Sequence, residues 1–141
     1  MCLPEFRRMT AEDVDAVEAI QKASLPNAAA GWAACDFLKL EPWVAICGTA
    51  VVSFLVSRAV AEEEFELLNM AVAPEYRRRG LGKALLAHVL QLHPGVWYLE
   101  VRESNEAAYR LYEGLGFHRS GRRREYYQSP PEDAIEMSKL S

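Results

Sequence analysis

A loop rich in glycine and arginine joins an apolar strand to an apolar helix near the middle of the chain, and it limits the possible folds more than any other feature. The loop and the start of the helix read EYRRRGLGKALL from Glu75 to Leu86, after the apolar stretch 65–72. A strand that passes through a tight loop into a helix is typical of an α/β domain. Gly80 and Gly82 leave backbone N–H groups uncovered at the positive end of that helix, where a phosphate can approach closely. The sequence therefore predicts an anion site, and a pyrophosphate suits the neighbouring cations.

Two common phosphate-binding motifs do not fit this loop. A Walker A motif requires a glycine where the chain has Arg77, and a serine or threonine where it has Ala84. A dinucleotide-binding fingerprint requires a third glycine where the chain has Leu85. The 16 basic and 20 acidic residues give a net charge of -4, which argues against general nucleic-acid binding. A solvated turn that holds no ligand is the alternative at this point.

Apolar stretches and the breaks between them predict one α/β domain over residues 1–141. We expect strands at 4–9, 43–47, 50–57, 65–72, 96–101, 117–127 and 134–140. We expect helices from Thr10 to the break at 25–27, over 31–40, over 81–92 and over 104–115. The resulting order is β-α-α-β-β-β-α-β-α-β-β, a mixed and mostly antiparallel sheet flanked by helices.

The remaining composition favours a reduced protein of the cytoplasm. Cys2, Cys35 and Cys47 are odd in number and widely spaced, so we expect neither a disulfide framework nor a zinc site. His88 and His93 have no acidic residue or cysteine at ligand spacing, and no metal is expected. No window approaches the apolar length of a membrane span, and the first residues do not resemble a signal peptide.

Three parts of the chain, the last of them made of two tail segments, resemble the GNAT N-acetyltransferases. Arg77, Gly80 and Gly82 match the acetyl-CoA-binding motif R/Q-x-x-G-x-G/A of that family, within the stretch 69–82. Residues 99–117 and the tail segments 124–127 and 132–137 resemble the RimI branch, the ribosomal-protein-alanine N-acetyltransferases. The resemblance implies a GNAT fold and acetyl-CoA as the co-substrate.

The same resemblance implies two catalytic residues. Glu100 corresponds to the general base of the family and Tyr112 to its general acid. Glu66 is the rival base, since other branches place a carboxylate on the preceding strand. The alternatives are a salt bridge of Glu100 with Arg102 or another surface partner, and an ordinary core position for Tyr112. The catalytic motifs contain no cysteine, so we expect direct transfer through a ternary complex.

The resemblance also implies binding residues for both substrates. The residues expected to bind acetyl-CoA are Met70, Ala71, Val72, Arg78, Arg79, Gly80, Leu81, Gly82, Lys83 and Asn105. Those expected to bind the acceptor are Leu25, Pro26, Tyr126 and Tyr127. Bacterial RimI sequences commonly have a Pro-Trp pair in the early loop, whereas this chain has Pro26-Asn27. The early loop of this chain therefore departs from the pattern of that branch.

The expected function is transfer of an acetyl group to the N-terminal α-amine of a protein. The resemblance favours the alanine N-terminus of the eighteenth protein of the small ribosomal subunit as the acceptor. The alternatives are a small-molecule amine, other protein N-termini or lysines, and a non-catalytic acyl-CoA sensor. The basic run 119–124 is expected to be a solvated hairpin edge. We therefore expect neither direct nucleic-acid contact nor membrane association, and a monomer or weak dimer.

Overall fold

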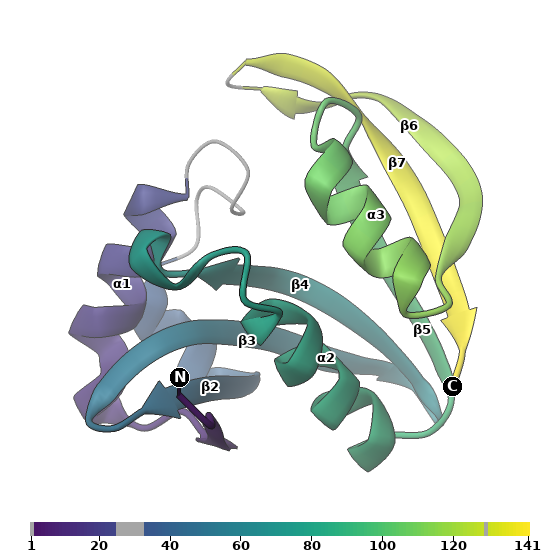
Figure 1. Cartoon of the computed structure of the whole chain (residues 1–141). Helices are drawn as coiled ribbons and strands as arrows, with labels where there is room; N and C mark the ends of the chain where they lie inside the picture. The colour runs from purple at the N-terminus through teal and green to yellow at the C-terminus, as the bar shows by residue number, and fades with distance from the viewer. Residues whose placement is uncertain (1, 25–32, 129) are drawn as a thin grey trace.

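Seven strands form one sheet in the computed structural model, which describes residues 2–24, 33–128 and 130–141 (Figure 1). The strands are β1 (Glu5–Arg8), β2 (Glu41–Cys47), β3 (Ala50–Ala61), β4 (Glu64–Val72), β5 (Val96–Arg102), β6 (His118–Gln128) and β7 (Pro131–Leu140). The order across the sheet is β1-β2-β3-β4-β5-β7-β6. The α-helices are α1 (Val14–Ala23), α2 (Leu81–Leu92) and α3 (Glu106–Gly114). Short 3-10 helices cover Ala11–Asp13, Ala34–Lys39 and Pro74–Tyr76.

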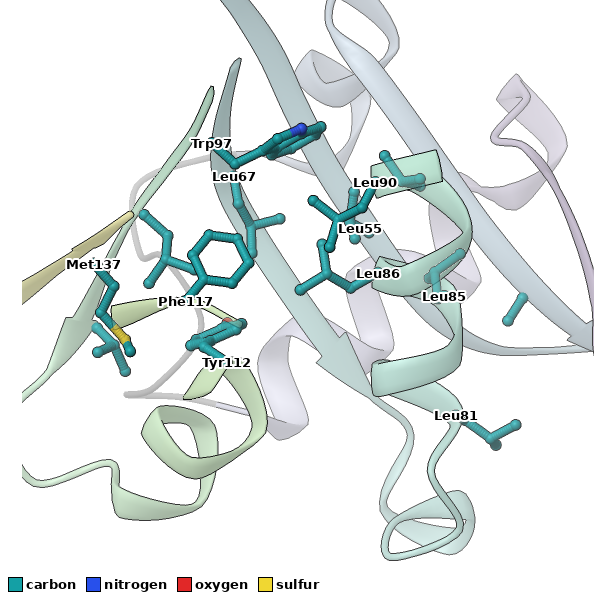
Figure 2. Close-up of a cluster of buried hydrophobic side chains, with 14 of the residues drawn as sticks. Leu55, Leu67, Leu81, Leu85, Leu86, Leu90, Trp97, Tyr112, Phe117 and Met137 are labelled. Carbon is teal, nitrogen blue, oxygen red and sulfur yellow. The ribbon is translucent and has the colours of Figure 1, made fainter. Parts of the chain in front are cut away.

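The alternation of side chains along the strands divides the core into two clusters, one on each face of the sheet. Ala45 and Leu55 belong to a cluster with the apolar residues of α2 and with Tyr112 of α3. Figure 2 shows part of this cluster, in which Leu86 of α2 approaches Leu55 and Trp97 lies beside Leu67. Val44 belongs to the second cluster, which packs against α1. The sheet is therefore covered by α2 and α3 on one face and by α1 on the other.

The predicted fold class is confirmed, and the structure adjusts some boundaries. The helix expected over 31–40 is described only from residue 33, and there it is the 3-10 helix Ala34–Lys39. The strand expected to end at residue 57 extends to Ala61. The sequence order also does not reveal that β7 lies between β5 and β6. That arrangement places the last two strands beside β5 and brings distant residues to one site.

The parallel pair β4–β5 determines where the sheet opens. Their pairing is limited to Glu64 with Val96, Phe65 with Trp97, and Glu66 with Tyr98. Beyond this point β4 continues along β3, whereas β5 continues along β7. Figure 1 shows β4 and β5 starting close together and separating toward their far ends. The separation leaves the β5 side of β4 without strand partners from Leu67 onward.

The structure corrects one expectation from the sequence, because Cys2 and Cys47 form a disulfide. The pairing of Glu5 with Ile46 between β1 and β2 brings the two cysteines together, with their Cα atoms 5.7 Å apart. Their separation of 45 residues hid this proximity in the sequence. Cys35 is free and exposed. The expectation of a fully reduced chain is therefore wrong for this structure.

Within the part of the chain that the structure describes, no helix has both the length and the apolar character needed to cross a membrane.

Candidate active site

A cavity of about 590 Å³ fills the opening between β4 and β5. Its walls come from β4, the loop after β4, the start of α2, β5 and α3. The predicted residues that line it are Met70, Ala71, Val72, Arg78, Gly80, Leu81, Gly82, Lys83, Glu100, Asn105, Tyr112 and Tyr127. We call this cavity the donor cavity. The fold thus brings twelve of the predicted site residues to one place.

The two glycines of the loop are required by its backbone and by its packing. Gly80 is the N-cap of α2 and has a φ of 75°, in the left-handed region that glycine adopts without a steric cost. A Cβ atom at Gly82 would lie 3.2 Å from Cγ2 of Val72, so a larger residue would press against β4. Both residues line the donor cavity. The loop therefore brings the N-terminal end of α2 to the cavity wall.

The helix N-terminus supplies the chemistry of an anion site. The first helical hydrogen bond at this end runs from the Ala84 N–H to the Gly80 carbonyl, so the N–H groups between them have no partner within the helix. Lys83 lies in the first turn and is exposed. Backbone N–H groups, the helix dipole and a cation all favour a phosphate group here.

The three arginines of the loop have different surroundings. Arg77 donates through Nε to the Val72 carbonyl at 3.1 Å, and through Nη2 to the Ser24 hydroxyl at 3.2 Å. It thereby fixes the end of α1 against the loop. Arg78, with a φ of 64°, lines the donor cavity. Arg79 was predicted to bind the cofactor, but its guanidinium carbon lies 5.3 Å from the centroid of the Tyr76 ring, and it is not among the lining residues.

The strand β4 presents an open backbone edge to the donor cavity. Met70, Ala71 and Val72 pair with β3 on one side and line the cavity on the other. Backbone N–H and C=O groups at such an edge are available to an extended ligand. Across the cavity, Asn105 caps α3 by accepting a hydrogen bond of 3.2 Å from the Ala108 N–H.

Glu100 and Tyr112 both reach the donor cavity, from β5 and from α3 respectively. Burial raises the pKa of Glu100, while Arg123 lowers it and the carboxylates of Glu136 and Glu66 raise it. Its Oε2 atom is buried and has no hydrogen-bond partner. A carboxylate that is partly desolvated and free of hydrogen bonds at this oxygen is a stronger base than an exposed one.

Tyr112 is buried beside Phe117, with the two ring centroids 6.0 Å apart (Figure 2). Burial raises the pKa of Tyr112 to about 12. The phenol therefore keeps its proton at neutral pH and is able to donate it. Tyr112 contacts the core and lines the cavity, so the structural and catalytic interpretations of this residue are compatible.

A second, smaller cavity of about 220 Å³ lies next to the first. It is lined by Val60, Glu66, Tyr98, Leu99, Glu100, Ser120, Arg123, Glu136 and Met137. Leu99 and Glu100 line both cavities. We call the smaller one the acidic cavity, after its three carboxylates. Glu100 is thus the ionisable residue at the boundary between the two.

The rival base Glu66 has a different environment from Glu100. Its Oε1 atom lies 2.7 Å from Nη2 of Arg58 and accepts a hydrogen bond of 2.9 Å from Nε of the same residue. Glu66 lines the acidic cavity and not the donor cavity. This ion pair is close, whereas the Glu100 Oε2 atom lies 3.7 Å from the Arg123 Nε atom, and Glu100 faces both cavities.

The predicted acceptor residues are only partly described. Tyr126 and Tyr127 have ring centroids 5.1 Å apart, and Tyr127 lines the donor cavity beneath the guanidinium of Arg102, whose central carbon lies 4.3 Å from the ring centroid. Burial is the largest cause of the raised pKa of both tyrosines. Leu25 and Pro26 lie outside the described residues.

Sequence reasoning did not identify every residue of the site. Asn69, Ala107 and Leu111 also line the donor cavity, and Arg123 and Glu136 line the acidic cavity. The apolar spacing within the helix expected over 104–115 was the available signal for Leu111. No local signal links Arg123 to Glu100, because only the sheet order brings them together. Among the described residues, no group of three or more histidine, cysteine, aspartate or glutamate side chains is arranged to hold a metal ion.

A comparison of the sequence with protein-family models assigns the chain to a family, and the opened sheet and the glycine loop agree with that assignment. Residues 11–117 match the model of the acetyltransferase (GNAT) family, which is most of the chain. The chain therefore belongs to the acetyltransferase (GNAT) family. This confirms the GNAT resemblance of the stretches 69–82 and 99–117, which lie within the matched residues.

Individual relatives resemble the chain to different degrees. The ribosomal protein bS18-alanine N-acetyltransferase of Escherichia coli (strain K12) is 43% identical over 94 residues, which cover 62% of this chain and 63% of that enzyme. The match thus spans less than two thirds of that relative's length. The crystal structure of the Escherichia coli ribosomal-protein-S18-alanine N-acetyltransferase has a TM-score of 0.82 and 31% identity, covering 98% of this chain and 94% of the other. Arabidopsis thaliana NAA60 in complex with acetyl-CoA shares the fold with a TM-score of 0.86 and 19% identity, covering 99% and 100%.

Proposed function

We propose that this protein transfers an acetyl group from acetyl-CoA to the N-terminal α-amine of a protein, with the alanine N-terminus of ribosomal protein bS18 as the foremost acceptor. The observation that carries the proposal is the position of Glu100, which lines both the donor cavity and the acidic cavity. A base at the boundary between the two cavities is within reach of an amine that attacks a thioester in the donor cavity. The name of the Escherichia coli relative supports the choice of acceptor.

The donor cavity fits acetyl-CoA in three respects. The N-terminus of α2, with Gly80 and Lys83, offers backbone N–H groups and a cation to a pyrophosphate. The open edge of β4 offers backbone hydrogen bonds to an extended pantetheine arm. A β4 N–H directed at the thioester oxygen would stabilise its developing charge by several kcal/mol, on the order of one oxyanion-hole donor.

The reaction requires one base and one acid. The amine nitrogen attacks the thioester carbon only when it carries a lone pair, so Glu100 accepts the proton that leaves the nitrogen. The new C–N bond forms and the C–S bond breaks. Tyr112 then donates its proton to the departing thiolate, since a phenol with a pKa of about 12 is protonated at neutral pH.

An N-terminal amine suits this base better than a lysine does. The α-amine has a pKa of about 8, whereas that of a lysine is about 10.4, so less free energy is needed to deprotonate the α-amine. Tyr126 and Tyr127 provide an aromatic wall for a peptide chain near Glu100. The proposal also places the reaction in the cytoplasm and takes the protein to act as a monomer or weak dimer without direct nucleic-acid contact.

A panel of acceptors tests the proposal. Thiol release from acetyl-CoA is measured with a peptide beginning Ala-Arg-Tyr, with the same peptide blocked at its N-terminus and carrying an internal lysine, with small amines, and without an acceptor. We expect turnover with the free N-terminus alone. Faster turnover with small amines would contradict the protein acceptor, and acetyl-CoA binding without turnover on any acceptor would favour a sensor.

A further inference from the structure

The strand order creates a conflict of charge beside Glu100. The register of β5 and β7 places Glu100 directly opposite Glu136, and the two side chains line the same acidic cavity. Like charges directly opposite each other on neighbouring strands destabilise a sheet. The Glu136 side chain packs against Gly121 of β6, where a Cβ atom would lie 2.6 Å from the Glu136 Oε1 atom. Because glycine has no Cβ atom, it leaves space for the carboxylate at this position. The two carboxylates are therefore held close together by the backbone.

Arg123 of β6 lies between these two carboxylates. Its Nε atom is 3.7 Å from the Glu100 Oε2 atom and 3.5 Å from the Glu136 Oε2 atom. Its guanidinium carbon is 5.3 Å from the centroid of the Tyr126 ring, which gives the cation a second support. The Arg123 guanidinium thus attracts both carboxylates and also contacts Tyr126, one of the residues expected to bind the acceptor.

The other charged and titratable groups around Glu100 cannot replace Arg123. Glu66 faces it from β4, and the nearby cation Arg58 is engaged by Glu66. Tyr126 and Tyr127 face it from β6, and each has a pKa raised above its ordinary value. Arg123 is the cation whose attraction lowers the pKa of Glu100 most, against the opposing effects of Glu136 and Glu66.

We propose that Arg123 is a positioning residue for Glu100, which holds the base at the boundary between the two cavities by attracting it together with Glu136 while resting on Tyr126. The catalytic meaning of this role rests on the proposed function. The position of the carboxylate itself is independent of it. Loss of Arg123 would leave Glu100 and Glu136 to repel each other and turn apart.

The two partners of Glu100 have opposite effects, which makes the proposal sharply testable. Removal of the Arg123 charge withdraws a stabiliser of the ionised Glu100 carboxylate, so its pKa rises. Removal of the Glu136 charge withdraws a repulsion, so the pKa of Glu100 falls. An arginine-to-lysine change keeps the charge and should largely preserve the behaviour of the wild type.

The experiment titrates Glu100 directly by ¹³C NMR of glutamate-labelled protein, with its signal assigned from Glu100→Gln. The variants are Arg123→Met, Arg123→Lys and Glu136→Gln. The matched control is Arg119→Met, which removes an arginine of the same strand that lines neither cavity. The kcat and the two KM values are measured in parallel with acetyl-CoA and the Ala-Arg-Tyr peptide.

We expect the titration midpoint of Glu100 to rise in Arg123→Met, to fall in Glu136→Gln and to stay near the wild-type value in Arg123→Lys and Arg119→Met. The kcat of Arg123→Met should fall about tenfold at neutral pH, which is less than the whole contribution of a general base. The kcat should recover in part at higher pH, because Glu100 is then deprotonated again. The KM for acetyl-CoA should not change.

An unchanged titration in Arg123→Met, or an equal change in Arg119→Met, would overturn the proposal. A wild type that acetylates no acceptor, while Glu100 still titrates as described, would refute the proposed function and support the position of Arg123. The two failures are therefore distinguishable.

Discussion

At the scale of single residues, burial raises the pKa of both catalytic candidates, a carboxylic acid and a phenol. Glu100 and Tyr112 both have a raised pKa with burial as the largest cause, yet the consequence differs. A raised pKa makes a carboxylate a stronger base, while it keeps a phenol protonated as an acid. The sequence supplied these two residue types through the family motif, but not the burial that raises both pKa values.

The pH dependence of turnover tests the state of Tyr112. The free phenol has a pKa of about 10, and in the folded protein burial raises it to about 12. The phenol in the folded protein therefore stays protonated up to the pKa of a free phenol and beyond it. The free energy of unfolding begins to fall only when the pH exceeds the pKa of the free phenol, because the unfolded chain then ionises first. We expect kcat to show no descending limb below about pH 10.

The variant Tyr112→Phe should lower kcat by about a hundredfold, because the departing thiolate then has no proton donor. Thiol-release assays across the pH range measure both effects. A descending limb near neutral pH in the wild type, or full activity of Tyr112→Phe, would argue against Tyr112 as the acid.

The left-handed backbone of Gly80 allows a second test at this scale. A Cβ atom at Gly80 meets nothing within 4 Å, so Gly80→Ala adds backbone strain alone, about 1–2 kcal/mol. Because Gly80 shapes the start of α2, we expect a higher KM for acetyl-CoA and an unchanged KM for the peptide. Steady-state kinetics with each substrate varied in turn give both values.

Gly48 provides the matched control. It has a φ of 64° and equally open space, and it lies in the turn between β2 and β3, outside the donor cavity. Gly48→Ala should cost similar stability and leave both KM values unchanged. An equal rise in the KM for acetyl-CoA in both variants would mean that strain, and not the shape of the loop, causes the effect.

At the scale of elements, two devices fix parts of the fold that the sequence pattern does not reveal. One is the irregular register of β6, where Arg123 pairs with Ala134 and the next pair is Tyr127 with Glu132. Residues 124–126 therefore form a bulge that turns the tyrosine pair, and the Glu125 N–H is held by Asp133 at 2.9 Å. The other device is the disulfide that joins the N-terminal segment to the end of β2.

The disulfide between Cys2 and Cys47 predicts a dependence of stability on reducing agent. Closure of a loop of this size stabilises a folded chain by about 2–4 kcal/mol, mostly through the unfolded state. Reduction, or the variant Cys47→Ser, should therefore lower the melting temperature. Neither cysteine lines either cavity, so kcat should be unaffected.

Thermal unfolding with and without dithiothreitol measures this contribution. Cys35→Ser is the control, since Cys35 is exposed and free, and it should unfold as the wild type does. A melting temperature that does not respond to dithiothreitol would show that the two thiols do not pair in solution.

At the scale of the whole molecule, the sequence predicted the elements better than their assembly. Apolar periodicity located the strands and α2, because each has one face against a core. The sheet order with β7 beside β5, and the separation of β4 from β5, depend on contacts between residues far apart in the chain. The same contacts bring Arg123 to Glu100, so the acidic cavity had no sequence signal, whereas the donor cavity did.

The central claim is that Glu100, at the boundary between the two cavities, is the base for acetyl transfer to a protein N-terminus. Its most direct test is mass spectrometry of an Ala-Arg-Tyr peptide after incubation with acetyl-CoA and the wild type, Glu100→Gln or Glu66→Gln. We predict one acetyl group on the N-terminal nitrogen with the wild type and with Glu66→Gln, and a rate about a hundredfold lower with Glu100→Gln. A loss of acetylation in Glu66→Gln with full activity in Glu100→Gln would contradict the claim.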